Sequence, residues 1–139
     1  TERLDDARVC VDTSAIQQVL VNLLQNAIKF TPDGGHVAIR TRRMSEQVVM
    51  YIEDNGIGIP RNALAQIGKP FEVAENYFNK TYKGSGLGLA IAKSLVEMHG
   101  GSMRIRSLLG SGTIVRVSIP EKRAEGCCAD AVWQPLAVA

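Results

Sequence analysis

Near its middle the chain runs Lys83-Gly84-Ser85-Gly86-Leu87-Gly88-Leu89-Ala90 and continues as Ile91-Ala92-Lys93-Ser94-Leu95-Val96-Glu97-Met98-His99. Three glycines at alternate positions therefore open an apolar run with helical spacing, which places one stripe on Leu87, Ile91, Leu95 and Met98. Glycine lets a ligand approach the main chain, and a helix N-terminus offers unpaired N–H groups that suit phosphate. The stretch predicts a phosphate-binding loop, although a tight turn alone would use similar glycines.

Two familiar phosphate loops do not fit this stretch. A Walker A motif needs glycine directly before Lys-Ser, but Ala92 precedes Lys93 here. The dinucleotide pattern G-x-G-x-x-G needs glycine at position 89 or 91, where the chain has leucine and isoleucine. If the loop binds phosphate, it does so in another architecture.

Bulk composition limits the classes of partner. The 139 residues fit one domain, and a net charge of +2 with 5% aromatic residues argues against a nucleic-acid partner. The three cysteines are Cys10, Cys127 and Cys128, an odd number without a CxxC pair, so we expect no disulfide framework and a cytoplasmic setting. No apolar run approaches 18 residues, so we expect no membrane insertion. Thr1 suggests an excised fragment, whose parent protein could itself be attached to a membrane.

Hydrophobic periodicity predicts the other elements. A helix starts near Asp12, with Ser14 and Gln17 spaced as a capping box. Its apolar stripe is Ile16, Val19, Leu20, Leu23, Leu24 and Ala27. Alternation predicts strands over residues 36–42, 48–52, 103–106 and 115–119, an edge strand over 9–11, and a short helix over 60–66. This order favours an α+β two-layer sandwich over residues 1–120, followed by a flexible tail over 121–139.

Two groups of polar residues could carry chemistry. Asn22, Asn26 and Lys29 share one face of the first helix, well away from its apolar stripe. They form either a solvated face or an amide oxygen for Mg²⁺ with an ammonium for phosphate. Asp54 continues the buried parity of the strand before it, where it either caps the next turn or accepts a hydrogen bond from an exocyclic amine. Gly56 would then let a base lie against the backbone, as would Gly58.

The histidines and arginines can be explained without a functional role. His99 ends a helix, where the helix dipole accounts for it. Five arginines alternate along the predicted strands and could form a basic strip, although a solvated face is the simpler interpretation. These are Arg40, Arg42, Arg104, Arg106 and Arg116.

Taken together, four stretches resemble the ATP-binding domain of sensor histidine kinases. Residues 18–32, 54–60 and 84–90 look like its N, G1 and G2 boxes in the right order, and residues 110–113 look like its last glycine box. The resemblance covers about residues 4–120, and residues 67–101 look most like the PleC/DivJ-type cell-cycle kinases. Several boxes in order are far more specific than one.

The resemblance implies a Bergerat-type fold of the GHKL superfamily, a mixed and mostly antiparallel sheet covered on one face by about three helices. It implies ATP and Mg²⁺ as cofactors, Asn26 as the Mg²⁺ ligand with Asn22 its partner, and Asp54 as the residue that binds the adenine amine. It assigns phosphate contacts to Lys29, Gly84, Gly86 and Gly88, and places Ser85, Leu87 and Leu89 in the nucleotide-binding site. Further nucleotide contacts fall on Phe30, Gly56, Gly58, Ile59, Phe71 and Thr113, and Lys80 or Lys83 would reach the γ-phosphate from a lid over residues 68–83.

Two departures shape the implied function. Related ATPases carry a glutamate general base where this chain has Asn22, and an amide cannot accept a proton, so we expect no rapid ATP hydrolysis. Histidine kinases phosphorylate a histidine in a motif like H-E-x-x-x-P, but neither His36 nor His99 stands in one. We therefore expect a separate helical dimerisation and phosphoacceptor domain, a downstream response regulator, and a monomeric fragment.

Three other functions stay open on the sequence alone. The first is an ATP-binding regulatory or scaffold module without phosphotransfer. The second is a serine-directed kinase or anti-sigma factor of the same superfamily. The third is an α+β domain that binds no nucleotide. The intact boxes argue against the scaffold module, and the order of the motifs argues against a domain without nucleotide. The lid and the Gly-Leu-Gly-Leu start of the helix favour the histidine kinase over the serine-directed version.

Overall fold

The computed structural model describes residue 9, residues 11–65, residue 67 and residues 87–121. The predicted lid, with Phe71, Lys80 and Lys83, lies outside the described residues, as do the first glycines of the phosphate loop and the tail over 122–139. Within the part described, no helix is both long and apolar enough to cross a bilayer.

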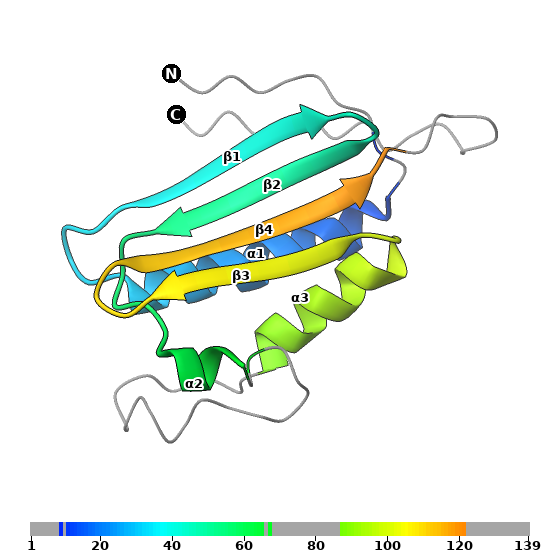
Figure 1. Ribbon diagram of the computed structural model, residues 1–139. Coiled ribbons are helices and arrows are strands. Elements are labelled where there is room, and N and C mark those ends of the chain that lie inside the picture. Colours follow the sequence, from blue (N-terminus) through cyan, green and yellow to red (C-terminus); the bar gives the residue numbers. More distant parts are fainter. Residues whose placement is uncertain (1–8, 10, 66, 68–86, 122–139) are drawn as a thin grey trace.

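Four strands form one antiparallel sheet (Figure 1). They are β1 (Val37–Met44), β2 (Gln47–Asp54), β3 (Ser102–Leu108) and β4 (Gly112–Pro120). Their order is β1-β2-β4-β3, so the last strand inserts between β2 and β3. The prediction of an α+β sandwich with a mostly antiparallel sheet is confirmed, and no parallel pair occurs among the described strands.

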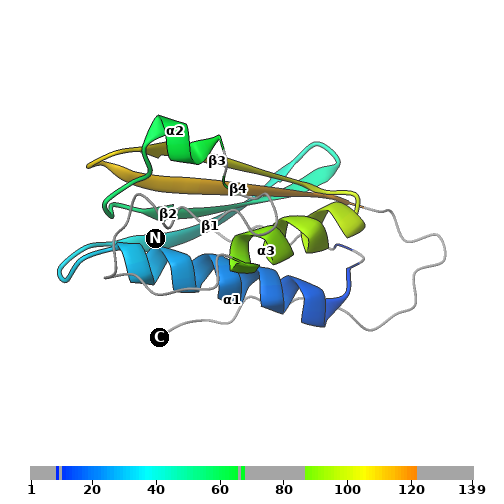
Figure 2. The same cartoon turned by 90° about the horizontal axis from the view of Figure 1, so that it is seen from below.

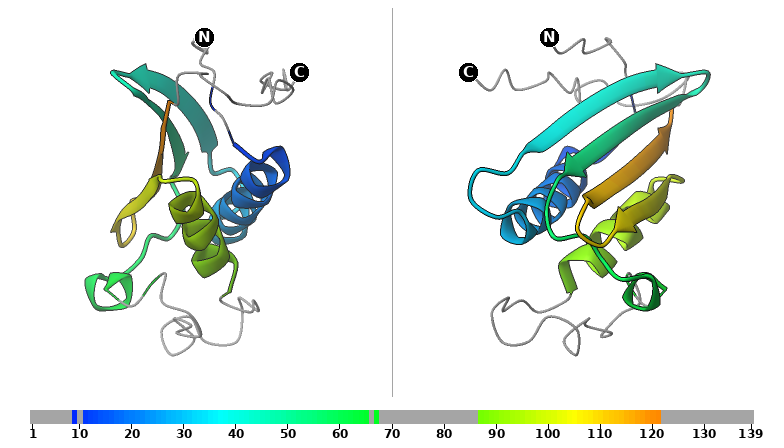
Figure 3. Two further views of the ribbon diagram at one scale, coloured as in Figure 1. Left: turned by 90° about the vertical axis from the view of Figure 1, so that its right-hand side faces the viewer. Right: turned by 60° about the vertical axis from the view of Figure 1, so that its left-hand side comes forward.

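Two long helices, α1 (Thr13–Phe30) and α3 (Leu87–Met98), lie side by side on one face of the sheet (Figure 2). The short α2 (Arg61–Leu64) falls within the predicted helix over 60–66 but lies at the β3 edge (Figure 3). Two described helices therefore cover the face, rather than about three.

The core fills the space between these helices and the sheet. It consists of Ile16, Val19, Leu23 and Ala27 from α1, Ala92 and Val96 from α3, and Met50, Ile52, Val115, Val117 and Ile119 from the two central strands. The stripe predicted for α1 is confirmed by its buried residues.

The stripe predicted for α3 is wrong for Ile91 and Met98, although Leu95 packs against the core. Ile91 is 45% exposed and Met98 is 79% exposed, whereas Ala92 and Val96 are fully buried. The buried stripe is displaced by about one residue around the helix because the short side chains of Ala92 and Val96 let α3 lie close to α1 and the sheet.

The start of α1 also differs from the prediction. Asp12, rather than Ser14, is the N-cap, and its Oδ1 accepts hydrogen bonds from the backbone N–H groups of Ser14 (2.8 Å) and Ala15 (3.3 Å). A carboxylate also interacts favourably with the positive end of the helix dipole, which a hydroxyl does not. Val9 and Val11 pack against the core but belong to no strand, so the predicted edge strand is wrong for both described residues.

His99 joins the two helices at this end. Its Nδ1 lies 2.7 Å from the Leu95 carbonyl oxygen, and its Nε2 accepts the backbone N–H of Asp12 at 3.1 Å. Because Nε2 must carry a lone pair here, Nδ1 carries the hydrogen and donates to Leu95. The residue that the helix dipole seemed to explain therefore ties the end of α3 to the start of α1.

Candidate functional site

Three segments far apart in the sequence meet beside the second half of α1. The backbone N–H of Ile57, in the turn after β2, donates to the Phe30 carbonyl at 3.0 Å. The Asn22 side chain donates to the Gly88 carbonyl in the first turn of α3 at 3.1 Å. The predicted N box thus contacts the predicted G1 box at its end and the predicted G2 box at its middle.

Asn22 lies between α1 and α3 and is only 8% exposed. Its Nδ2 donates to Gly88, and its Oδ1 accepts from Gln18 Nε2 at 2.9 Å. The prediction that this face of α1 lies well away from the apolar stripe is wrong for Asn22, because α3 packs along that flank and covers it. A Cβ added at Gly88 would stand 3.7 Å from the Asn22 amide carbon, so the two residues are in ordinary contact.

Asn26 and Lys29 follow at one-turn spacing and are partly exposed. Asn26 makes no hydrogen bond to the residues that the structure describes, which leaves its amide oxygen available to a ligand. Lys29 Nζ lies 5.0 Å from the centroid of the Phe30 ring, within the range of a cation–π contact. The ammonium is thus held near the end of α1, beside the turn that follows β2.

Whether the described residues could bind Mg²⁺ depends on which ligand atoms they offer. Across the described ranges, no group of three or more His, Cys, Asp or Glu side chains could hold a metal ion by itself. Mg²⁺ usually takes only one or two protein oxygens and completes its shell with water and substrate phosphate. The Asn26 amide oxygen fits such a site only when a polyphosphate is bound beside it.

Asp54 serves the first of its two predicted roles in this structure. Its Oδ1 accepts the Gly56 N–H at 2.9 Å and so caps the turn after β2. The side chain is half-buried, and its second oxygen accepts no hydrogen bond from the described part of the chain. One carboxylate oxygen fixes the turn, and the other is left for a donor.

Protein contacts explain why two of the predicted site residues are glycines. A Cβ at Gly56 would lie 2.3 Å from the Phe30 carbonyl oxygen, and one at Gly58 would lie 2.1 Å from that of Leu108. Gly58 also has a φ of +69°, which side chains rarely adopt. Both glycines press the turn against its neighbours, and their predicted contact with a base stays a prediction.

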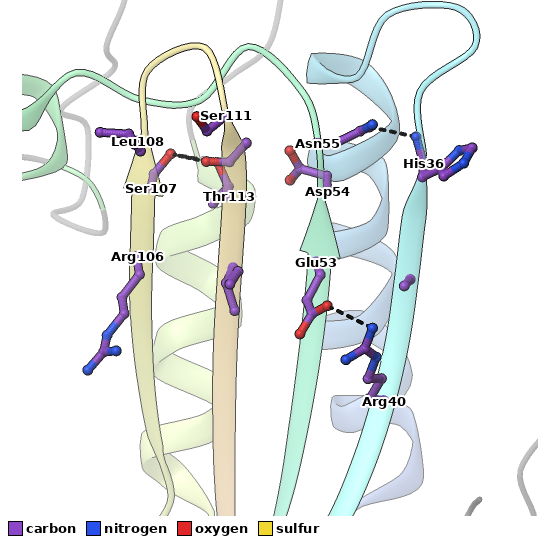
Figure 4. A pocket seen from close by; sticks show the side chains of 13 residues that line it. His36, Arg40, Glu53, Asp54, Asn55, Arg106, Ser107, Leu108, Ser111 and Thr113 are labelled. Carbon is purple, nitrogen blue, oxygen red and sulfur yellow. Dashed lines mark hydrogen bonds and ion pairs between the residues drawn. The ribbon is translucent and has the colours of Figure 1, made fainter. Parts of the chain in front are cut away.

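Thr113 stands directly opposite Asp54 in the pairing of β2 with β4. Its Oγ1 lies 2.8 Å from Ser107 Oγ on β3, as Figure 4 shows. Ser107 Oγ also accepts the backbone N–H of Ile59 at 2.8 Å. Sequence reasoning missed Ser107, although its signal was the same as that of Asp54, a polar side chain at the core-facing parity of a strand that carries Met103 and Ile105.

A hollow of about 560 Å³ also opens at this end of the sheet, but on the face away from α1 and α3 (Figure 4). Arg40 and Glu53 line it from the neighbouring strands β1 and β2, form an ion pair at 3.4 Å and point away from the core. Asn22, Asn26 and Lys29 belong to α1, which covers the other face of the sheet, and none of them lines this hollow. It shares only Asp54 and Thr113 with the predicted site.

Comparison with known proteins decides the family. The family model of histidine kinase-, DNA gyrase B- and HSP90-like ATPases matches residues 11–123. The chain belongs to this family. The match spans every strand and helix described above, and it includes all four predicted boxes.

Several of the similar proteins are named as histidine kinases. The chain is 43% identical to an uncharacterized sensor-like histidine kinase of Rhizobium meliloti over 123 residues, which cover 86% of this chain and 23% of that protein. It is 45% identical to the non-motile and phage-resistance protein of Caulobacter vibrioides, covering 82% of this chain and 14% of the relative. Histidine protein kinase DivJ of the same organism is 36% identical, covering 83% of this chain and 19% of DivJ. The chain thus spans less than a quarter of each of these relatives.

Solved structures agree with the sequence relatives. The nucleotide-free catalytic domain of histidine kinase ThkA has a TM-score of 0.73 and 32% identity, covering 86% of this chain and 75% of that one. Full-length ShkA in complex with AMPPNP has a TM-score of 0.65 and 30% identity, covering 76% of this chain and 21% of that one. The predicted Bergerat-type fold and the resemblance to histidine kinase catalytic domains, with DivJ among the relatives, are confirmed.

Proposed function

We propose that this chain binds Mg²⁺-ATP and donates the γ-phosphoryl group to a histidine on a separate helical dimerisation domain. The observation that carries the proposal is the convergence of three motifs around α1. The Phe30–Ile57 and Asn22–Gly88 hydrogen bonds bring the N, G1 and G2 boxes together in a chain of this family. ShkA, a structural neighbour, was solved with an ATP analogue bound, which supports the choice of nucleotide.

The adenine end of the proposed site is built on the sheet. The second oxygen of Asp54 would accept a hydrogen bond from the exocyclic amine of the base, with Thr113 beside it on β4. Phe30, Ile59 and the two turn glycines would border the ring. Because Gly56 holds Asp54 Oδ1 in place, the carboxylate is oriented before a ligand arrives.

The phosphate end of the proposed site is built on the helices. Lys29 would offer its ammonium from the end of α1, and the first turn of α3, with Leu87, Gly88 and Leu89, would offer the positive end of its helix dipole. Asn26 would hold Mg²⁺ by its amide oxygen together with the phosphates. The ion, when bound, would neutralise charge on the transferring phosphoryl group.

The chain's own residues favour transfer over hydrolysis. Asn22 stands where related ATPases carry a general base, but an amide takes no proton at neutral pH. In this structure both ends of its amide are also engaged, with Gln18 and Gly88. A water molecule near the γ-phosphate would therefore find no base at this position, which spares the nucleotide for another acceptor.

The partners follow from the proposed reaction. The acceptor histidine belongs to a helical dimerisation domain, a downstream response regulator would receive the phosphoryl group, and both reactions would take place in the cytoplasm. We expect the isolated chain to be monomeric. An ATP-binding scaffold module without phosphotransfer is the alternative that the experiment below separates.

The test is phosphotransfer from γ-labelled ATP to a separately purified helical domain that carries the acceptor histidine of the parent protein. We expect Mg²⁺-dependent, acid-labile label on the helical domain, and none when its histidine is replaced by glutamine. If the chain binds ATP saturably but never labels the helical domain, the scaffold alternative replaces the kinase.

A further inference from the structure

Ser107 forms the centre of a hydrogen-bond cluster at the adenine end of the proposed site. Its Oγ lies 2.8 Å from the backbone nitrogen of Ile59, 2.9 Å from the carbonyl oxygen of Gly112 and 2.8 Å from Oγ1 of Thr113. These neighbours come from the turn after β2 and from β4, so one β3 hydroxyl joins the segments that border the base. Neither the sequence motifs nor the proposed reaction uses Ser107.

Counting hydrogens fixes the direction of every bond in the cluster. A serine hydroxyl has one hydrogen and two lone pairs. The Ile59 N–H can only donate and the Gly112 carbonyl can only accept, so Ser107 accepts from the first and gives its hydrogen to the second. All three bonds coexist only if Thr113 donates its own hydrogen to Ser107. Thr113 then offers nothing but lone pairs to any ligand.

Asp54, next to Thr113, also presents only hydrogen-bond acceptors. The two residues are directly paired across β2 and β4, and both have the parity of the core-facing side chains. Asp54 Oδ1 already accepts from Gly56, and an ionised carboxylate has no hydrogen to give. Side by side, Asp54 and Thr113 present acceptors and no donor.

We propose that Ser107 is a positioning residue that makes the base site select an exocyclic amine over a carbonyl oxygen. Adenine carries an amine at its 6-position, whereas hypoxanthine and guanine carry a carbonyl oxygen there. A carbonyl facing Asp54 and Thr113 would meet lone pairs only, and a partly buried acceptor without a donor is unfavourable. Without Ser107, the Thr113 hydroxyl could rotate and donate to that carbonyl. The inference rests on the proposed adenine site.

The experiment compares ATP with ITP, whose hypoxanthine carries a carbonyl oxygen at the 6-position and a hydrogen on N1, where adenine carries an amine and an N1 without hydrogen. Calorimetric Kd values are measured for both nucleotides with the unmodified chain, Ser107→Ala and Ser107→Thr. We expect the ATP preference of the unmodified chain to fall about tenfold in Ser107→Ala, mainly because ITP binds more tightly. Ser107→Thr keeps the hydroxyl and should restore the preference.

A second background tests whether Ser107 acts through Thr113. In Thr113→Val, which has no hydroxyl to orient, replacing Ser107 by alanine should leave the ATP-to-ITP ratio unchanged. If Ser107→Ala does not fold, Thr113→Val alone must still lower the ratio, because it removes one of the two acceptors. Equal weakening of ATP and ITP by Ser107→Ala would overturn the inference while the proposed function stands. Failure of the unmodified chain to bind either nucleotide would overturn both.

Discussion

Gly58 offers a direct test of how tightly the turn after β2 is packed. The residue has a φ of +69°, and an added Cβ would lie 2.1 Å from the Leu108 carbonyl oxygen and 3.0 Å from the Leu109 Cα. These are backbone atoms of the β3–β4 hairpin, so neither can move aside as a flexible side chain would. Gly58→Ala must therefore shift the turn or the hairpin.

The loss of unfolding free energy in Gly58→Ala has two parts, backbone strain and overpacking, and a matched control separates them. Gly110, in the same hairpin, has a φ of +81° but nothing within 4 Å of an added Cβ. Gly110→Ala should cost only the backbone strain, roughly 1–2 kcal/mol. Gly58→Ala adds overpacking of about 1–3 kcal/mol, so we expect its free energy of unfolding to lie lower than that of Gly110→Ala by that amount.

Urea denaturation followed by circular dichroism measures this difference. With a slope of about 2 kcal/mol/M, the midpoint for Gly58→Ala should lie about 0.5–1.5 M below that for Gly110→Ala. Both are measured without nucleotide, so that no ligand contact enters the comparison. Equal midpoints would refute the claim that the turn is pressed against the hairpin.

Three further substitutions test other contacts of the structure. Asn22→Ala should lower the free energy of unfolding by about 1–3 kcal/mol because it removes two hydrogen bonds, with Gly88 and Gln18, at a position that is only 8% exposed, and an unchanged urea midpoint would contradict this. His99→Phe should lower the free energy of unfolding by about 1 kcal/mol in the same assay because the backbone N–H of Asp12 loses its acceptor. An unchanged urea midpoint would show that this hydrogen bond does not stabilise the fold. Asn26→Asp should weaken Mg²⁺-dependent nucleotide binding about tenfold because it places a like charge beside the phosphates, and the same Mg²⁺ dependence as in the unmodified chain would remove Asn26 as a ligand.

The sequence predicted the layers of this fold because their signals are local. Periods of 3.6 and 2 residues locate α1 and the four strands, and turn residues separate them. The buried side of α3 escaped prediction because it depends on which helix and strands it meets. Ala92 and Val96 face the core although larger side chains lie on the neighbouring stripe.

The sequence motifs predicted which residues belong to the candidate site, but not which of them contact one another. Asn22 appeared to belong to a polar face, and only the approach of α3 explains its burial and its bond to Gly88. Ser107 carries no motif, and its role depends on a cross-strand register that joins β3 to β4. Its bond to the backbone of Ile59, 48 positions earlier in the chain, is set by tertiary packing, which a single sequence does not display.

The most direct test of the account is calorimetric titration of ATP into this chain, with and without Mg²⁺, beside the Asp54→Asn variant. We predict saturable, Mg²⁺-sensitive binding to the unmodified chain. The variant should lose affinity for ATP but keep its affinity for bare pyrophosphate, because Asp54 would contact only the base. If ATP does not bind, or if Asp54→Asn weakens ATP and pyrophosphate equally, the proposed adenine site is wrong.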